Sequence, residues 1–234
     1  MKKIFLLVHG LMNHDDHDMN NLFAYLNSKK EKEEEVKLVY LYNHEDHHSY
    51  KYKRQWKVLN GIVTDYLAQG YEVNVLGFSF STSLVARLCK EHKNINRLVL
   101  ISPTFKLIGS GFIPNYVKVI TKSLKMKWKY RKNKKAKSKM LKAHLNHIIS
   151  LIFGVLHSMI KNKKSYKYIY CPTLIMKGTE DEFVSQKQIY MIQKMMKSKE
   201  IDIKIYKDFN HTFIRREEDC NPDVYEYIYR FIFK

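Results

Sequence analysis

Six short β-rich segments, separated by segments with helical periodicity, constrain the fold of this chain most strongly. Several of them are nearly continuous in apolar residues, which is typical of parallel strands buried on both faces. This alternation of strand and helix predicts a parallel sheet covered by helices on both faces, with right-handed crossovers. The six expected strands are residues 4–8, 36–42, 72–77, 97–101, 172–177 and 201–206.

The intervening segments carry apolar residues at helical spacing, so each presents one apolar face. The last of them follows Asn221 and Pro222, a favourable start because asparagine caps a helix and proline is tolerated in its first turn. A chain of 234 residues with 45% hydrophobic content can form one such domain with a sizeable core. The expected helices lie within residues 56–67, 84–88, 189–196 and 224–232.

Residues 105–167 interrupt the alternation between the fourth and fifth expected strands. The segment is too long for a simple connection, and its sequence is helical in pattern and rich in lysine. We therefore expect a core formed by residues 1–104 and 168–234. Residues 105–167 are expected to form a cap of two or three helices over the strand ends.

Nearly all of the formal net charge of +19 lies in this expected cap. Residues 105–170 contain 17 of the 42 Lys and Arg residues and none of the 23 Asp and Glu residues, so the rest of the chain is close to neutral. The charge fits a solvated helix surface, or peripheral contact with an anionic membrane, since Trp128 and Tyr130 lie among the lysines. Nucleic acid is the least favoured partner because no recognised motif accompanies the charge.

The cysteines and the apolar runs of the sequence indicate where in the cell the protein is expected. The three cysteines, Cys89, Cys171 and Cys220, are far apart and lack metal-ligand spacing, which argues against a disulfide framework and a zinc site. The first apolar run ends after Val8, short of a signal peptide, and residues 145–160 are too short and too polar to span a bilayer. We expect a cytoplasmic protein, at the inner face of the membrane if the cap binds lipid.

Two clusters of His and acidic residues, 13–18 and 43–48, resemble metal-ligand sets in composition. Both follow expected strands, and two clusters at one sheet edge could converge on zinc or nickel. Such runs in hydrophilic loops are more often solvated, so no functional metal is expected.

Three residues that come just after expected strands form a chemically coherent set. Ser79 follows the third strand, Asp181 the fifth and His211 the sixth. Functional groups gather at the carboxyl ends of parallel strands, so the fold would bring these side chains together. A serine hydroxyl becomes a nucleophile when an imidazole takes its proton and a carboxylate orients the imidazole. The set therefore predicts a catalytic triad.

Four motifs containing or flanking these residues resemble the α/β-hydrolase family, in particular small bacterial carboxylesterases and monoacylglycerol-lipase-like enzymes. They are LLVHGL (6–11), GFSFS (77–81), PTLIMKGTEDEFV (172–184) and FNHTF (209–213). The order Ser, Asp, His is also that of the family. The resemblance covers nearly the whole chain and implies a sheet of about six parallel strands.

The resemblance also implies roles for individual residues. Among the three acidic residues 180–182, the family pattern G-x-x-D-x-x-V selects Asp181 over Glu180 and Glu182. The backbone N–H groups of Leu11 and Phe80 would form the oxyanion hole. Phe78 and Met12 are expected to line the substrate pocket, with Phe80 beside Phe78 at an apolar mouth.

One departure from the family concerns Ser81, which stands where the nucleophile motif has its second glycine. That position is normally small because the helix after the nucleophile passes close to neighbouring backbone. Serine is among the smallest possible replacements. We therefore expect the turn to survive with a slightly displaced helix.

The predicted function is hydrolysis of carboxylic esters by a serine hydrolase that forms an acyl-enzyme and needs no metal or organic cofactor. Monoacylglycerols, lysophospholipids and short-chain esters are the expected substrates. Serine at position 79 argues against dehalogenase and epoxide-hydrolase chemistry, and a cap without acidic residues argues against an aminopeptidase. The alternative is a catalytically inactive hydrolase-like protein that binds lipid or anionic partners through its basic cap.

Overall fold

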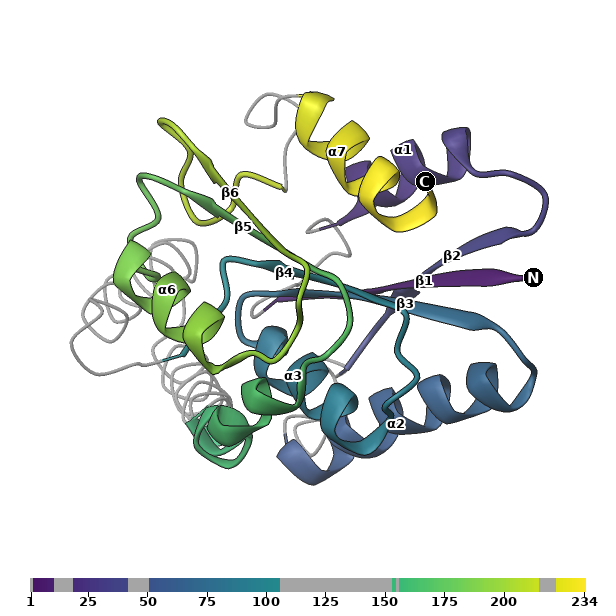
Figure 1. Ribbon diagram of the computed structural model, residues 1–234, viewed down its shortest axis with the longest axis horizontal. Helices are drawn as coiled ribbons and strands as arrows, with labels where there is room; N and C mark the ends of the chain where they lie inside the picture. The colour runs from purple at the N-terminus through teal and green to yellow at the C-terminus, as the bar shows by residue number, and fades with distance from the viewer. Residues whose placement is uncertain (1, 11–18, 42–50, 106–152, 155, 215–221) are drawn as a thin grey trace, which may run out of the picture.

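A computed structural model describes residues 2–10, 19–41, 51–105, 153–154, 156–214 and 222–234 (Figure 1). Its centre is a six-stranded parallel sheet with the strand order β2-β1-β3-β4-β5-β6. Each expected strand is present, as the alternation of strand and helix predicted. The strands are β1 (Lys3–Val8), β2 (Glu34–Val39), β3 (Glu72–Phe78), β4 (Arg97–Ile101), β5 (Thr173–Gly178) and β6 (Ile201–Tyr206).

The second strand is the one whose boundaries differ most from the prediction. It was expected at residues 36–42 but spans Glu34–Val39. β2 pairs only with β1, in a register that matches Lys3 to Glu34 and Val8 to Val39. The partner strand thus sets both ends of this edge strand, which the apolar pattern of β2 alone does not reveal.

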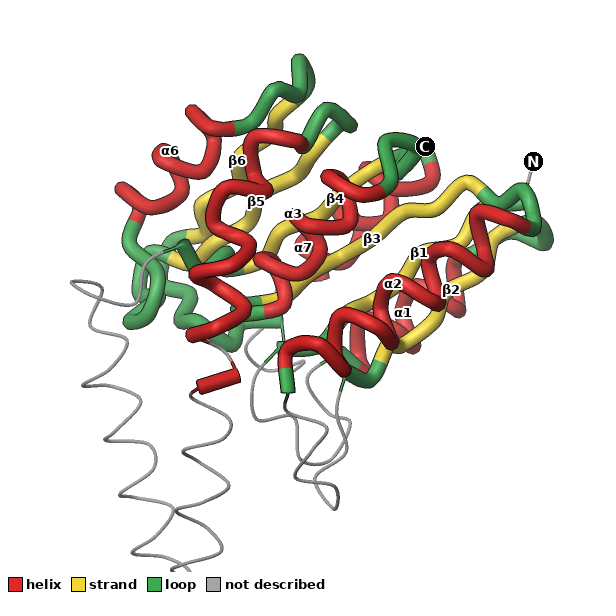
Figure 2. The backbone as a smooth tube through the Cα atoms, turned by 90° about the horizontal axis from the view of Figure 1, so that it is seen from below, coloured by secondary structure: helices red, strands yellow, loops and turns green. Residues whose placement is uncertain are grey.

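Helices cover both faces of the sheet (Figures 1 and 2). α1 (Asn20–Lys29) and α7 (Pro222–Phe233) lie on one face, and α2 (Tyr52–Ala68), α3 (Ser81–Glu91) and α6 (Gln186–Met195) lie on the other. The alternation of side chains along β1 shows why, because Ile4 and Leu6 belong to the core beneath α2 and α3 while Phe5 and Leu7 belong to the core beneath α1 and α7.

α1 is a helix that the sequence analysis did not predict. It has no side-chain cap and no acidic residue in its first turn, and asparagines at both ends lower its intrinsic propensity. Leu22 and Leu26 are nevertheless fully buried, in the same core cluster as α7. Tertiary packing therefore stabilises this helix more than its local sequence does.

The described part of the expected cap packs against the core. Residues 153–154 and 156–162 are helical and lead into the short 3₁₀ helix η2 (Lys163–Tyr168), which contacts α3. The rest of the segment 105–167 lies outside the described residues, apart from Phe105, so the division into core and cap stays a prediction. In the described ranges, no helix has the length and apolar character required to cross a membrane.

Candidate active site

Ser79 occupies the sharp turn between β3 and α3. Its backbone has a φ of 56°, in the left-handed region that costs a residue with a side chain about 1–3 kcal/mol. Neighbouring hydrogen bonds hold this conformation: the Ser79 N–H donates to the Ile101 carbonyl (2.8 Å), and the Ser79 carbonyl accepts from Thr82 N–H and Thr104 Oγ1, both at 3.2 Å. The strained turn is therefore fixed from α3 and from the loop after β4.

The glycine before the turn is required by close packing. A Cβ added to Gly77 would lie 2.6 Å from a methyl group of Val85 and 3.0 Å from the Thr82 Cα. Both neighbours belong to α3, so any side chain at position 77 would push the helix away from β3. The first glycine of the nucleophile motif thus sets how closely α3 approaches the strand.

Ser81, at the position of the missing second glycine, has a defined structural role. Its side chain is fully buried, and its Oγ accepts a hydrogen bond from the Phe78 N–H (2.9 Å). The same Oγ lies 3.0 Å from the carbonyl oxygens of both Val8 and Phe78, to either of which the hydroxyl can donate. The hydroxyl therefore links the carboxyl ends of β1 and β3, a contact that glycine cannot make.

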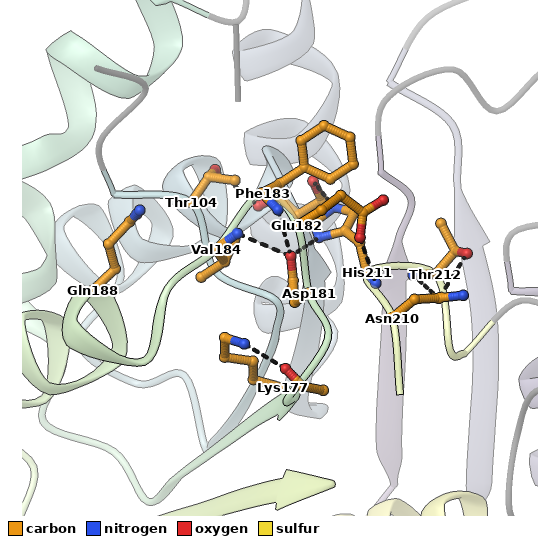
Figure 3. Close-up of polar contacts among 12 residues, drawn as sticks. Thr104, Lys177, Asp181, Glu182, Phe183, Val184, Gln188, Asn210, His211 and Thr212 are labelled. Carbon is orange, nitrogen blue, oxygen red and sulfur yellow. Dashed lines mark hydrogen bonds and ion pairs between the residues drawn. The ribbon is translucent and has the colours of Figure 1, made fainter. Parts of the chain in front are cut away.

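His211 and Asp181 complete a hydrogen-bonded chain with Ser79. His211 Nδ1 lies 2.9 Å from Asp181 Oδ1 (Figure 3). His211 Nε2 lies 2.9 Å from Ser79 Oγ. Since an ionised carboxylate only accepts hydrogen bonds, Nδ1 carries the proton and Nε2 is the acceptor for the Ser79 hydroxyl. All three residues are nearly inaccessible to solvent.

Several donors hold the carboxylate of Asp181 in its ionised form. Its Oδ1 accepts hydrogen bonds from the backbone N–H groups of Phe183 and Val184, each at 2.9 Å (Figure 3). Burial by itself would raise the pKa of Asp181. The hydrogen bond and charge of His211, assisted by the Ser102 hydroxyl and the Val184 amide, outweigh burial and hold the pKa below its ordinary value.

The turn that carries Asp181 and the loop that carries His211 are in direct contact. A Cβ on Gly178 would lie 1.9 Å from the Phe209 carbonyl oxygen, so only glycine fits at the end of β5. The same carbonyl accepts a hydrogen bond from the Glu180 N–H (2.9 Å). This contact fixes the distance between the acid and the base through the backbone as well as through their side chains.

Aromatic rings enclose the imidazole of His211. The Phe183 ring meets it edge-on with a centroid distance of 4.8 Å, and the Phe78 ring is tilted against it at 5.5 Å. Phe78 and Phe80 are each 1% exposed and belong to the two core clusters on opposite faces of the sheet. Their contribution to a substrate pocket stays a prediction.

The two residues expected to contribute to the oxyanion hole are only partly described. Leu11 lies outside the described residues, as does the expected pocket residue Met12. Phe80 directly precedes the first residue of α3, so its amide belongs to the amino end of a helix, where partial positive charge favours an anion.

The imidazole of His9, two residues before Leu11, is held by two hydrogen bonds. His9 Nε2 accepts from the Leu41 N–H (2.9 Å), so Nδ1 carries the proton and donates to the Gly10 carbonyl (2.6 Å).

The structure does not test whether the two clusters of His and acidic residues bind a metal. Among the described residues, no group of three or more His, Cys, Asp or Glu side chains is arranged to hold a metal ion. The loops 13–18 and 43–48 lie outside those residues, and so does Cys220. Cys89 and Cys171 are free thiols.

Sequence reasoning missed residues that support the triad rather than form it. Thr82 and Thr104 bind the Ser79 carbonyl, and the nearby Ser102 hydroxyl helps to lower the pKa of Asp181. Ser102 had a usable signal, because it directly follows β4 at the sheet edge where the triad lies. Its φ of 46° and the hydrogen bond from its N–H to the Met176 carbonyl (2.8 Å) hold it there.

A parallel sheet of this strand order, with a serine at the turn after β3 and acidic and histidine residues after β5 and β6, defines an α/β-hydrolase fold. The model of one family, described as serine aminopeptidase S33, matches residues 57–219, well over half of the chain. The protein belongs to this family of hydrolases. Among curated proteins, none matches the chain significantly.

Solved structures with the same fold, all of low sequence identity, include esterases and lipases. A soluble variant of monoglyceride lipase from Saccharomyces cerevisiae, in complex with a substrate analogue, aligns with a TM-score of 0.67 and 15% identity, covering 100% of this chain and 86% of that one. An esterase from Exiguobacterium antarcticum gives 0.63 and 14%, covering 99% and 92%. The monoacylglycerol lipase of Paleococcus ferrophilus gives 0.62 and 17%, covering 98% and 93%.

Proposed function

We propose that this protein is a serine hydrolase that cleaves carboxylic esters through an acyl-enzyme. Ser79 is the nucleophile, and His211 is the general base and acid. Asp181 orients the imidazole of His211 and stabilises its protonated, positively charged form. The observation that carries the proposal is the unbroken hydrogen-bonded chain from Ser79 Oγ through both nitrogens of His211 to Asp181 Oδ1, with 2.9 Å at each link.

The reaction proceeds in two half-reactions on these groups. Ser79 Oγ attacks the ester carbonyl carbon while its proton moves to His211 Nε2, and the resulting oxyanion is held by the amides of Leu11 and Phe80. The intermediate collapses when the carbon–oxygen bond to the alcohol breaks and His211 returns the proton to the departing alkoxide. Water then attacks the acyl-enzyme with His211 as base, releasing the carboxylic acid and restoring Ser79.

Carboxylesters and lipid monoesters are the proposed substrates. The esterase and the monoacylglycerol lipases among the similar structures support this class. The aromatic surroundings of His211 favour an apolar acyl chain at the site. Monoacylglycerols, lysophospholipids and short-chain esters remain the candidates, and the chemistry needs neither a metal nor an organic cofactor.

The test is covalent labelling by a fluorophosphonate probe, combined with turnover of p-nitrophenyl esters of increasing chain length. We expect labelling and turnover by the wild-type protein and loss of both in Ser79→Ala. Ser28→Ala, which changes an exposed serine of α1, is the matched control and should behave like the wild type. A correctly folded wild-type protein that is neither labelled nor active would support the alternative of an inactive binding protein.

The description of the family favours a second candidate activity, removal of an amino-terminal residue from a peptide. The same triad could attack an amide, but an aminopeptidase also needs a carboxylate near the substrate's α-amino group. Comparing amino-acid p-nitroanilides with p-nitrophenyl esters separates the two activities. Faster cleavage of the anilides, judged by kcat/KM, would replace the esterase proposal.

We also propose that the cap region makes peripheral contact with anionic membranes. Phe153 and Ile160 are 67% and 75% exposed, two turns apart in a helical segment that continues into Lys161, Lys163 and Lys164. Exposed apolar residues beside lysines are typical of helices at a membrane interface. Co-sedimentation should be strong with anionic liposomes, weak with neutral ones and reduced by salt. Equal, salt-independent binding to both would contradict this proposal.

A further inference from the structure

A cavity that is separate from the triad lies on the α2 and α3 side of the molecule. Its volume is about 500 Å³, within the range of sites that bind small molecules. None of its lining residues belongs to the triad. The cavity is lined by Tyr52, Lys53 and Trp56 of α2, Arg87 and Lys90 of α3, and His157, Lys161, Asn162 and Ser165 of the helical segment before β5.

All the charged side chains that line this cavity are basic. Lys53, Arg87, Lys90 and Lys161 contribute four positive charges, and none of the lining residues is acidic. Glu91 contacts Arg87 (3.6 Å) and Lys90 (3.9 Å) from outside the cavity. Within the described part of the chain, no carboxylate lies at ion-pair distance from Lys53 or Lys161. An anion bound among these cations would reduce their mutual electrostatic repulsion.

The central cation is held in a fixed orientation. The Arg87 guanidinium lies over the Trp56 ring at 3.9 Å from its centroid and donates a hydrogen bond to the Tyr52 hydroxyl. Tyr52 in turn donates to Asn162 Oδ1 (2.8 Å), and its ring stacks on His157 at 5.1 Å. A planar guanidinium restrained on two sides is preorganised for the oxygens of an anion.

Buried hydrogen bonds tie the cavity wall to the helix that follows the nucleophile. Asn162 Nδ2 donates to Ser158 Oγ (3.3 Å), and the Ser158 and Ser83 hydroxyls lie 2.9 Å apart. Asn162, Ser158 and Ser83 are each at most 1% exposed. The cavity is therefore a built feature of the fold rather than a chance gap between exposed lysines.

We propose that this cavity binds a small organic molecule that carries a phosphate monoester group. A doubly charged phosphate with three acceptor oxygens matches several cations around one fixed Arg87 better than a singly charged carboxylate does. The volume is several times that of a phosphate group, so an organic part fits beside it. The phosphate could belong to a soluble metabolite or to the headgroup of a lipid.

The test is isothermal titration calorimetry of the full chain with glycerol 3-phosphate, and with glycerol as the uncharged comparison. We expect saturable binding of glycerol 3-phosphate, no binding of glycerol, and weaker binding when NaCl is raised from about 50 to about 300 mM. The absence of saturable binding at low salt would exclude a soluble phosphate monoester as the ligand and leave only a lipid headgroup.

Two variants test the cavity itself. The double variant Lys53→Ala/Lys161→Ala removes two exposed cations and should weaken binding about tenfold or more, while Arg87→Lys keeps the charge but loses the planar fork. The matched control, Lys32→Ala/Lys199→Ala, removes the same charge from two exposed lysines outside the cavity. An equal loss in the control would mean non-specific attraction to a basic protein and would overturn the proposal.

Vesicles distinguish the two sources of the phosphate. Vesicles of phosphatidylcholine with phosphatidic acid present the same monoester as a headgroup, and phosphatidylcholine alone is the comparison. Binding of vesicles but not of glycerol 3-phosphate, lost in Lys53→Ala/Lys161→Ala but not in the control variant, assigns a lipid ligand. The reverse pattern assigns a soluble ligand. Failure of both probes overturns the site and leaves the proposed esterase activity unaffected.

Discussion

Restoring the family glycine at position 81 should destabilise this protein. Substitution toward the residue that a family favours usually stabilises a fold or leaves it unchanged. Here the Ser81 hydroxyl accepts from the Phe78 N–H at 2.9 Å and donates to the carbonyl of Val8 or Phe78 at 3.0 Å. Ser81→Gly removes both bonds in a fully buried position.

The magnitude follows from those contacts. Two buried hydrogen bonds contribute about 1 kcal/mol each, so Ser81→Ala should lower the free energy of unfolding by about 2 kcal/mol. Glycine adds about 0.5–1 kcal/mol through its larger backbone entropy in the unfolded chain, which brings Ser81→Gly to about 3 kcal/mol. For a chain of this size, that loss lowers Tm by about 6–12 °C.

Urea titration and thermal melting of the wild type, Ser81→Ala and Ser81→Gly provide the assay, with the exposed-site variant Ser28→Ala as the reference. The ester turnover of both Ser81 variants should also fall, mainly in kcat, because Phe78 directly precedes the nucleophile turn. A Ser81→Gly protein that melts at or above the wild-type temperature would refute the assigned role of the hydroxyl.

Three further outcomes are expected. Asp181→Asn should lower kcat by about 10³–10⁴ with little change in KM, because the amide cannot stabilise the charged imidazole; steady-state ester kinetics check this. The pKa of Asp181 is lowered in the folded protein, so its ionised form stabilises the fold above the ordinary carboxyl pKa of 3.8. This stabilisation is lost as the pH falls through the lower pKa of the folded state. The difference in urea midpoint between the wild type and Asp181→Asn should therefore stay constant from pH 7 to about 4 and shrink at lower pH. Lys177 is 3% exposed, and burial lowers its pKa. Lys177→Met should therefore raise the free energy of unfolding by about 1 kcal/mol at pH 7, and by less near pH 10, where the lysine is partly neutral in both the folded and the unfolded state. The exposed-site variant Lys199→Met should change the free energy of unfolding little in the same melting experiment.

The strands and the order of the chemical groups could be predicted because each rests on local sequence. Buried parallel strands are continuous apolar runs, and Ser79, Asp181 and His211 each follow such a run directly. All six strands are parallel, so their carboxyl ends share one edge of the sheet. Residues that directly follow these strands in the sequence therefore lie at that edge in the structure. The side chains of the proposed triad accordingly lie within hydrogen-bonding distance of each other.

Features that depend on contacts between distant segments could not be predicted in this way. The bounds of β2 are set by β1, and α1 depends on packing against α7. The sequence analysis treated Ser81 as a tolerated replacement, because a five-residue motif does not show that the end of β1 lies within reach of its hydroxyl. The basic cavity joins residues from three segments that no local pattern connects.

The late return of the chain to the sheet has a consequence for biosynthesis. β4 ends at Ile101 and its partner β5 begins at Thr173, so the ribosome completes residues 102–172 before the edge of β4 can be covered. Until then the nascent chain presents an unpaired, apolar edge strand, the kind of surface through which copies join. The lysines of residues 105–167 emerge during this interval, and we expect their like charge to repel neighbouring nascent chains. A chain truncated after residue 104 should therefore aggregate more readily than one that ends just before β5.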